Sequence, residues 1–298
     1  MLGAHGEIAP TYVGRFAPSP TGPLHFGSAI TAIGSYVCAR AAGGRWHVRI
    51  DDIDPARELP VASGSILRTL ARLGLDWDGP VSYQSTRREQ HQAAVQTLLG
   101  RGAAYRCICS RQRVAGPRYP GTCRTQYPAA NVRHAVRILA PVGLVVVRDR
   151  IQGEYAHDVQ DTFGDFVIWR VEDLPAYHLA TVLDDAVLGV TEVVRGADLL
   201  DSTPRQRILQ SAFGLPTPSY AHLPLALDRQ GFKLSKQTGA TALDDSPATA
   251  IVSAALGVLG HAPPRELAGA EVAELLNWAR QHWHLSRVPP QVPAAVAR

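Results

Sequence analysis

Two kinds of apolar pattern, one typical of strands and one typical of helices, alternate along the first hundred residues. Short apolar runs predict strands at 12–17 and 46–50, and apolar residues three and four positions apart predict helices over 26–42, 65–73 and 86–99. A glycine ends each of these helical patterns, as is typical of helix C-termini. A strand–helix–strand beginning predicts an open parallel sheet with helices packed against it.

The pattern changes between residues 102 and 173. This segment is rich in Arg, Pro, Gly and Cys, and its β-like runs lie at 135–139, 144–147 and 165–170. We interpret it as an inserted α+β subdomain with its own small sheet. The α/β pattern returns at 174–245, with a strand at 191–195 and a helix at 204–213 that has proline in its first turn.

We therefore predict an α/β fold in four parts. Residues 1–101 and 174–245 form the two halves of one catalytic-type domain, 102–173 form the insertion, and the Ala- and Leu-rich residues 246–298 form a short helical C-terminal region. The length suffices for a sizeable core.

Composition and charge add little that is specific. The chain is 46% hydrophobic and 19% charged, which is ordinary for a soluble globular protein. No apolar run reaches the roughly 18 residues of a membrane span, and the N-terminus lacks a signal-peptide pattern, so we expect a cytoplasmic protein that does not enter membranes. A net charge of +4 suits a polyanionic partner but also an ordinary solvated surface.

The turn Pro18–Ser28 is the first candidate for chemistry. It would end a strand and open a helix, so that backbone N–H groups and His25 face the phosphates of a nucleotide. Gly22 permits a tight bend, and Gly27 leaves room for a base or ribose. The alternative is a proline-stiffened loop whose histidine has only a structural role.

Two lysines form the second candidate. Lys233-Leu234-Ser235-Lys236 would place two cations where pyrophosphate leaves, and the loss of one such group typically costs ~3 kcal/mol, or ~100-fold in rate. The alternative is a solvated basic turn. Arginine supplies nearly all the positive charge of this chain, so two lysines so close together argue against a random surface pair.

Three of the four cysteines, Cys107, Cys109 and Cys123, are close in sequence. In a cytosolic chain this cluster favours a metal site over a disulfide framework, although a metal-free cluster is the alternative. The fourth, Cys38, lies on a predicted helix, where we expect a buried, inert thiol.

The segments Gly14–Gly22, Arg49–Asp54, the cysteine cluster and Lys233–Lys236, in this order, resemble the glutamyl branch of the class I aminoacyl-tRNA synthetases over residues 12–245. The resemblance implies a Rossmann-like catalytic domain that uses ATP with Mg²⁺. It implies catalytic roles for His25, Lys233 and Lys236, and ATP contacts at Pro18, His25, Gly27, Ser28 and Lys236. The nucleotide motif of the family ends in histidine where this chain has Ser28, to which we assign a supporting role.

Glutamate carries two carboxylates and one ammonium, so a matching site needs arginine forks and one acid. The resemblance implies glutamate contacts at Arg15, Ala17, Ser19, Asp51, Tyr177 and Arg195. Arg15 and Arg195 suit the carboxylates and Asp51 the ammonium, although a structural ion pair is the alternative for each arginine. The family usually has Glu in place of Asp51, so the direct contact to the ammonium is open.

The resemblance also implies one structural zinc ion held by Cys107, Cys109, Tyr119 and Cys123. Because only three thiolates are present, the fourth ligand would be Tyr119 or a nearby histidine such as His134. Several arginines surround this cluster and would contact tRNA phosphates or form a solvated face: Arg106, Arg111, Arg113, Arg118 and Arg124.

Only residues 246–298 follow the catalytic-type region, which is too few for a large anticodon-binding region. The chain is similar to short members of the branch that activate L-glutamate with ATP and transfer it to queuosine, the modified wobble base of tRNA(Asp). We therefore expect ATP, L-glutamate and queuosine-containing tRNA(Asp) as partners of a monomer. The alternatives are a truncated glutamyl-tRNA synthetase that charges the acceptor end, a non-catalytic RNA- or nucleotide-binding paralogue, and adenylation of another amino acid.

Overall fold

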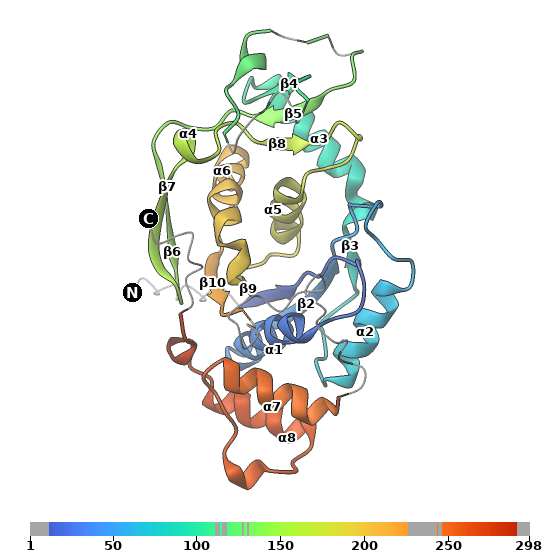
Figure 1. Cartoon of the computed structure of the whole chain (residues 1–298), viewed down its shortest axis with the longest axis vertical. Helices are drawn as coiled ribbons and strands as arrows, with labels where there is room; N and C mark the ends of the chain where they lie inside the picture. Colours follow the sequence, from blue (N-terminus) through green and yellow to red (C-terminus); the bar gives the residue numbers. More distant parts are fainter. Residues whose placement is uncertain are drawn as a thin grey trace, which may run out of the picture.

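Among the described residues the strands form three small sheets, of which two lie side by side in the middle of the molecule and the third lies towards one end of its long axis (Figure 1). The computed structural model describes residues 12–290 except 111–113, 115–117, 127, 130, 226–242, 244 and 245. The sheet formed by residues 104–107, 135–138 and 167–169 lies at one end of the long axis, and helices α7 (Ala248–Val258) and α8 (Val272–His282) lie at the other.

The first sheet is parallel and confirms the predicted strand–helix–strand beginning. Strands β1 (Val13–Phe16), β2 (Arg45–Ile50) and β3 (Ser82–Tyr83) pair in that order. Helices α1 (Phe26–Ala41) and α2 (Ala62–Arg72) pack beside it around the fully buried Trp46, whose Nε1 donates to Ser35 Oγ at 3.0 Å. Helices α7 and α8 cover the outer side of α1 and lie within the C-terminal region for which the sequence predicts helices.

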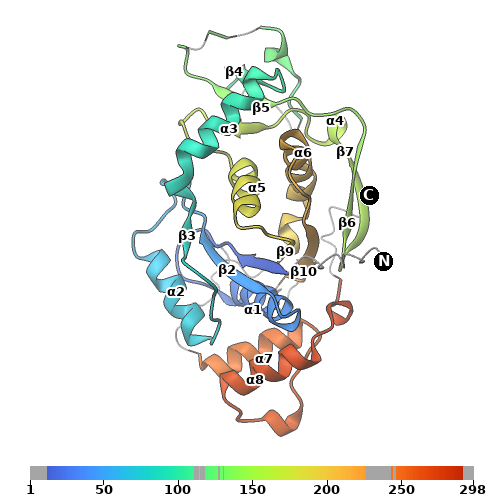
Figure 2. The ribbon, with the colours of Figure 1, turned by 180° about the vertical axis from the view of Figure 1, so that it is seen from behind.

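The second sheet has the order β7 (Gly153–Asp158), β6 (Leu144–Asp149), β10 (Ser219–Leu223), β9 (Glu192–Gly196). β9, β10 and β6 are parallel, and β7 returns antiparallel to β6. Helices α5 (Tyr177–Val187) and α6 (Thr203–Phe213) lie side by side next to it (Figure 2). The Thr191 amide donates to the Val13 carbonyl at 2.9 Å, which joins this sheet to β1.

The third sheet is antiparallel and consists of β4 (Ala104–Cys107), β5 (Ala135–Ile138) and β8 (Val167–Trp169). Helix α3 (Arg88–Gly100) runs towards it from the first sheet, after a 3₁₀ turn at Gln84–Arg87 where the sequence predicted helix from residue 86. Short helical turns complete the described chain: α4 (Val159–Thr162), η2 (Thr122–Arg124), η3 (Ala197–Ser202), η6 (Arg265–Leu267) and η7 (Leu285–Arg287).

One expectation for the insertion was wrong. The run 144–147 does not belong to the small sheet with β5 and β8, because it forms β6 and pairs with β10 through Asp149 and Tyr220. A short apolar run has no preferred partner within its own sequence, so burial of Val147 and Asp149 against distant elements decides its place. No helix among the described residues is long and apolar enough to cross a membrane.

The close approach of the turn before β2 to the backbone ahead of β1 makes Gly44 sensitive to substitution. A Cβ there would lie 2.3 Å from the Tyr12 carbonyl oxygen, so Gly44→Ala must displace backbone and is expected to cost about 1–3 kcal/mol. Gly100→Ala is the matched control, since its Cβ would meet nothing within 4 Å at the end of α3, and it is expected to be neutral or stabilising. Urea unfolding of both variants checks this, and equal stabilities would contradict the packing.

Candidate active site

A cavity of about 490 Å³ opens at the carboxyl ends of β1, β2, β9 and β10, where the first two sheets meet. The ten predicted substrate residues that the structure describes all line it: Arg15, Ala17, Pro18, Ser19, His25, Gly27, Ser28, Asp51, Tyr177 and Arg195. Lys233 and Lys236 lie outside the described residues. Clefts at this edge of parallel sheets are the usual binding sites of α/β proteins.

The Pro18–Ser28 turn brings the start of α1 to the cavity. Gly22 has φ 141°, a conformation that favours glycine. His25 caps α1, and its Nδ1 accepts a hydrogen bond from the Ser28 amide at 3.3 Å. Because Nδ1 accepts there, the ring proton belongs on Nε2, which leaves that nitrogen as the donor.

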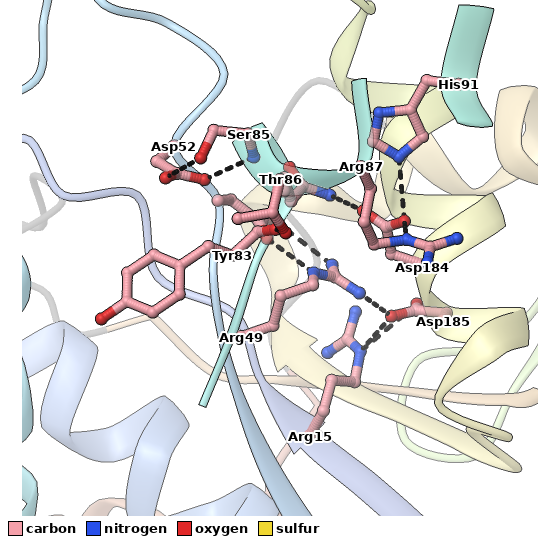
Figure 3. A network of polar contacts seen from close by, with 12 residues as sticks. Arg15, Arg49, Asp52, Tyr83, Ser85, Thr86, Arg87, His91, Asp184 and Asp185 are labelled. Carbon is pink, nitrogen blue, oxygen red and sulfur yellow. Dashed lines mark hydrogen bonds and ion pairs between the residues drawn. The ribbon is translucent and has the colours of Figure 1, made fainter. Parts of the chain in front are cut away.

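Four buried charged residues, Arg15, Arg49, Asp51 and Asp185, form a network that we call the buried charge cluster. Arg15 Nε donates to both oxygens of Asp185, at 3.1 and 3.3 Å, and Arg49 Nη1 donates to the same carboxylate (Figure 3). Arg49 Nε donates to Asp51 Oδ1 at 2.6 Å. Two cations and two anions therefore balance inside the protein, where an unpaired charge would be costly.

The two carboxyl groups of the cluster have opposite pKa shifts. Burial opposes ionisation of Asp185, but Arg15 and Arg49 outweigh it and hold the pKa of Asp185 below its ordinary value. Burial raises the pKa of Asp51 above its ordinary value, although Arg49 acts in the other direction. A further cation beside Asp51 would therefore stabilise its charged form.

The two arginines expected to bind carboxylates differ in how many of their nitrogens are already bonded. Arg15 uses only Nε in hydrogen bonds to described residues, so its two terminal nitrogens are available to a ligand. Arg195 donates through Nε, Nη1 and twice through Nη2, which occupies four of its five N–H groups. The structure thus favours Arg15 as the bidentate fork and leaves Arg195 a single N–H.

Arg49 lines the cavity and pairs with Asp185, and neither role was predicted from the sequence. The available signal was the pair Asp184-Asp185 inside the otherwise apolar helix pattern of α5, because adjacent buried acids are unusual. Asp184 accepts from Arg87 Nε at 2.7 Å and from Gln84 Nε2 at 2.9 Å, and so ties α5 to the start of α3 (Figure 3).

The cysteine cluster begins at Cys107, the last residue of β4, and none of its cysteines lines the cavity. The sulfur atoms of Cys107, Cys109 and Cys123 all lie within 4.8 Å of one another. The Tyr119 hydroxyl is 3.4 Å from Cys107 Sγ and 3.6 Å from Cys109 Sγ. His134 is not part of this group, and its Nδ1 faces the Val132 carbonyl, so the geometry favours Tyr119 as the fourth donor.

Two other expectations around the cysteines have clear outcomes. Cys38 is buried as predicted, and burial raises its pKa to about 12, which makes it a poor nucleophile. Arg124 forms an ion pair with Asp165 and Arg118 one with Asp161, so both make structural contacts. Arg111 and Arg113 lie outside the described residues.

Similarity to known proteins shows the family to which this protein belongs. Residues 12–251 match the family described as tRNA synthetases class I (E and Q), catalytic domain, and the chain belongs to that family. It is 52% identical over 285 residues to the Glutamyl-Q tRNA(Asp) synthetase of Thiobacillus denitrificans, covering 93% of this chain and 95% of that protein. It is 48% identical to the protein of that name from Pseudomonas aeruginosa PAO1, covering 94% and 96%.

The solved structures support the fold. A glutamate tRNA ligase from Elizabethkingia meningosepticum, in complex with its amino acid, superposes with a TM-score of 0.82 at 24% identity. The superposition covers 95% of this chain and 66% of that ligase.

The buried charge cluster predicts a large and pH-dependent cost for Asp185→Asn. Loss of this carboxylate leaves Arg15 and Arg49 under-compensated, which typically costs about 3–5 kcal/mol. Because the folded-state pKa of Asp185 is depressed, its contribution is complete above the ordinary carboxyl pKa of about 4 and is lost as the pH falls below that. The difference in unfolding free energy between wild type and variant should therefore shrink in acid.

Urea unfolding at a series of pH values measures this difference. The exposed Asp76 supplies the control, since Asp76→Asn is expected to change stability by less than about 0.5 kcal/mol. A cost for Asp185→Asn that stays the same down to the acid limit would show that the carboxylate charge does not stabilise the cluster.

Proposed function

We propose that this enzyme activates L-glutamate with ATP as glutamyl-adenylate and transfers the glutamyl group to queuosine at the wobble position of tRNA(Asp). The observation that carries the proposal is the cavity, whose charged groups complement glutamate and which lies beside the capped start of α1. Near full-length similarity to proteins named Glutamyl-Q tRNA(Asp) synthetase supports the acceptor.

The charges of the cavity match those of glutamate. The terminal nitrogens of Arg15 form a fork for one carboxylate, and the remaining N–H of Arg195 contacts the other. The ammonium lies against Asp51. Each oxygen of this carboxylate accepts from Arg49 and keeps a further lone pair that can accept from the ammonium. Tyr177, at the start of α5, adds a hydroxyl, and Ala17 and Ser19 form the wall at the end of β1.

ATP lies along the Pro18–Ser28 turn, with phosphates near the amides of α1 and His25 Nε2 as a donor. The glutamate α-carboxylate attacks the α-phosphorus, a new P–O bond forms, and the bond to pyrophosphate breaks. Lys233 and Lys236 oppose the charge that builds on the leaving group, and Mg²⁺ accompanies ATP. Catalysis is then mainly positioning and charge neutralisation.

In the second step a hydroxyl of the cyclopentene-diol of queuosine attacks the activated carboxyl carbon. An ester bond forms, AMP leaves with the electron pair of the broken C–O bond, and the hydroxyl proton passes to solvent. Presentation of one unstacked loop base is the usual way to recognise single-stranded RNA.

The deciding experiment incubates the enzyme with ATP, Mg²⁺ and radiolabelled glutamate, and compares tRNA(Asp) that contains queuosine with tRNA(Asp) that lacks it. Label is expected on the queuosine-containing tRNA alone. Label on both tRNAs, or on glutamate tRNA, would show instead a compact synthetase that acts at the acceptor end.

Pyrophosphate exchange into ATP, measured with glutamate, aspartate and glutamine, tests the first step separately. Glutamate should support the fastest exchange, and Lys236→Ala should lower it by roughly 100-fold. Absence of exchange despite binding of ATP and glutamate would favour a non-catalytic paralogue. Because Lys233 and Lys236 are the only lysines of the sequence, periodate-oxidised ATP followed by peptide mapping reports directly whether their loop contacts the nucleotide.

We also propose that Cys107, Cys109, Cys123 and Tyr119 hold one structural zinc ion. Three sulfur atoms and one phenolic oxygen converge, and thiolates favour zinc in a tetrahedral site. The ion would fasten the loop between β4 and β5, which supports the third sheet and not the cavity.

Elemental analysis of the purified protein is expected to find about one zinc ion per chain. Cys123→Ser should lose it, because three donors hold zinc poorly, whereas Cys38→Ser, the control at the distant buried cysteine, should keep it. Zinc retained by Cys123→Ser after dialysis against a chelator would contradict the site.

A further inference from the structure

Three neighbouring strands of the second sheet each supply one side chain to a buried series of hydrogen bonds. Asp149 ends β6, His222 lies on β10, and Arg195 lies on β9, where the parallel register places it beside His222. His222 Nδ1 lies 2.6 Å from Asp149 Oδ2, and Arg195 Nε lies 3.0 Å from His222 Nε2. The exposed fractions are 6%, 0% and 3% in the same order.

The partners determine the tautomer of His222. Arg195 Nε can only donate, so His222 Nε2 must accept and carries no proton. The Asp149 carboxylate can only accept, so Nδ1 carries the proton. Burial lowers the pKa of His222 below its ordinary value, although Asp149 opposes this, so the ring is neutral near pH 7.

Asp149 is itself firmly held. Its Oδ1 accepts from the backbone amides of Ile151, Gln152 and His222 at 3.0, 2.8 and 3.2 Å. Burial alone would raise the pKa of Asp149, but the hydrogen bonds from His222 and from these amides hold it below its ordinary value. The Asp149 carboxylate is thus a fixed acceptor at the end of this hydrogen-bonded series, on the side of His222 opposite Arg195.

We propose that Asp149 and His222 are positioning residues for substrate binding: by fixing the His222 tautomer, they hold Arg195 with one N–H directed to the substrate carboxylate. The inference rests on the proposed function, in which Arg195 contacts glutamate. Gln206 Oε1 and Thr203 Oγ1 hold the other side of the guanidinium, each at 2.8 Å, so Arg195 loses little rotamer freedom when the substrate binds.

Asp149→Asn tests the proposal without a change of shape. The Asn oxygen can keep the backbone amides, and its NH₂ then faces His222 Nδ1, which must become the acceptor. The ring proton moves to Nε2, opposite the Arg195 N–H, as happens when an amide replaces a carboxylate that orients a histidine. We expect the KM for glutamate in pyrophosphate exchange to rise roughly 10-fold or more, with kcat and the KM for ATP within about 3-fold of wild type.

His222→Gln provides the rescue. A Gln oxygen can lie near the position of Nε2 and accept from Arg195, and it has no tautomer to reverse. The double variant Asp149→Asn/His222→Gln should therefore have a lower KM for glutamate than Asp149→Asn alone, which a purely structural role of Asp149 would not produce. Asp165→Asn is the matched control: this buried acid also accepts a backbone amide, that of Ala140, but it lies in the third-sheet region.

¹⁵N chemical shifts of the histidine ring, assigned through His222→Gln, give an independent reading. Protonated Nδ1 in wild type and protonated Nε2 in Asp149→Asn would support the proposal; protonated Nε2 in wild type would overturn it. If the wild type catalyses pyrophosphate exchange and Asp149→Asn has the same KM for glutamate as the wild type, the positioning role alone is overturned. Absence of glutamate-dependent exchange in wild type would overturn the proposed function and the role with it.

Discussion

The ion pairs of Asp185 with Arg15 and Arg49 join the two halves of the catalytic-type domain. Asp185 lies on α5, after the third sheet in sequence, whereas Arg15 and Arg49 are each the last residue but one of two neighbouring strands in the first part of the chain. Each of these charges is nearly excluded from water, and isolated burial of any one would be strongly unfavourable. Helix α5 can therefore dock on the first sheet only in the arrangement that satisfies them, and this arrangement also brings Tyr177 to the cavity.

A second constraint acts on the other wall of the cavity. The parallel register of β9 and β10 places His222 beside Arg195, and β6 adds Asp149 from a segment that lies between β5 and β8 of the third sheet in sequence. Arg15 and Arg195 consequently have different roles although both line the same cavity. Arg15 is held through Nε alone among the described residues, whereas Arg195 donates through all three of its side-chain nitrogens. A fixed cation suits a small polyanionic substrate, because little reorganisation accompanies binding.

The third sheet and the cysteine cluster are connected to this centre without contributing to its lining. Helix α3 connects them to it by running from the first sheet to β4. Asp184 on α5 holds the start of α3 through Arg87, Gln84 and His91. Asp184 and Asp185 thus tie the same helix to two different parts of the molecule. The neighbouring acids explain why an apolar helix pattern contains two buried charges, and why α5 is central to the arrangement of the fold.

The local elements and the residue types of the site follow from the amino-acid sequence alone. Apolar patterns identified α1, β2, α6 and the C-terminal helices, and the resemblance to the synthetase family implied ten residues that the fold brings to one cavity. The partners of those residues are set by the folded arrangement. It paired β6 with β10 instead of with the small sheet, gave Arg15 and Arg49 a common partner in Asp185, and put His222 behind Arg195. Such pairings join segments up to 170 residues apart, and local propensity carries no information about them because burial and charge compensation arise only when the chain is folded.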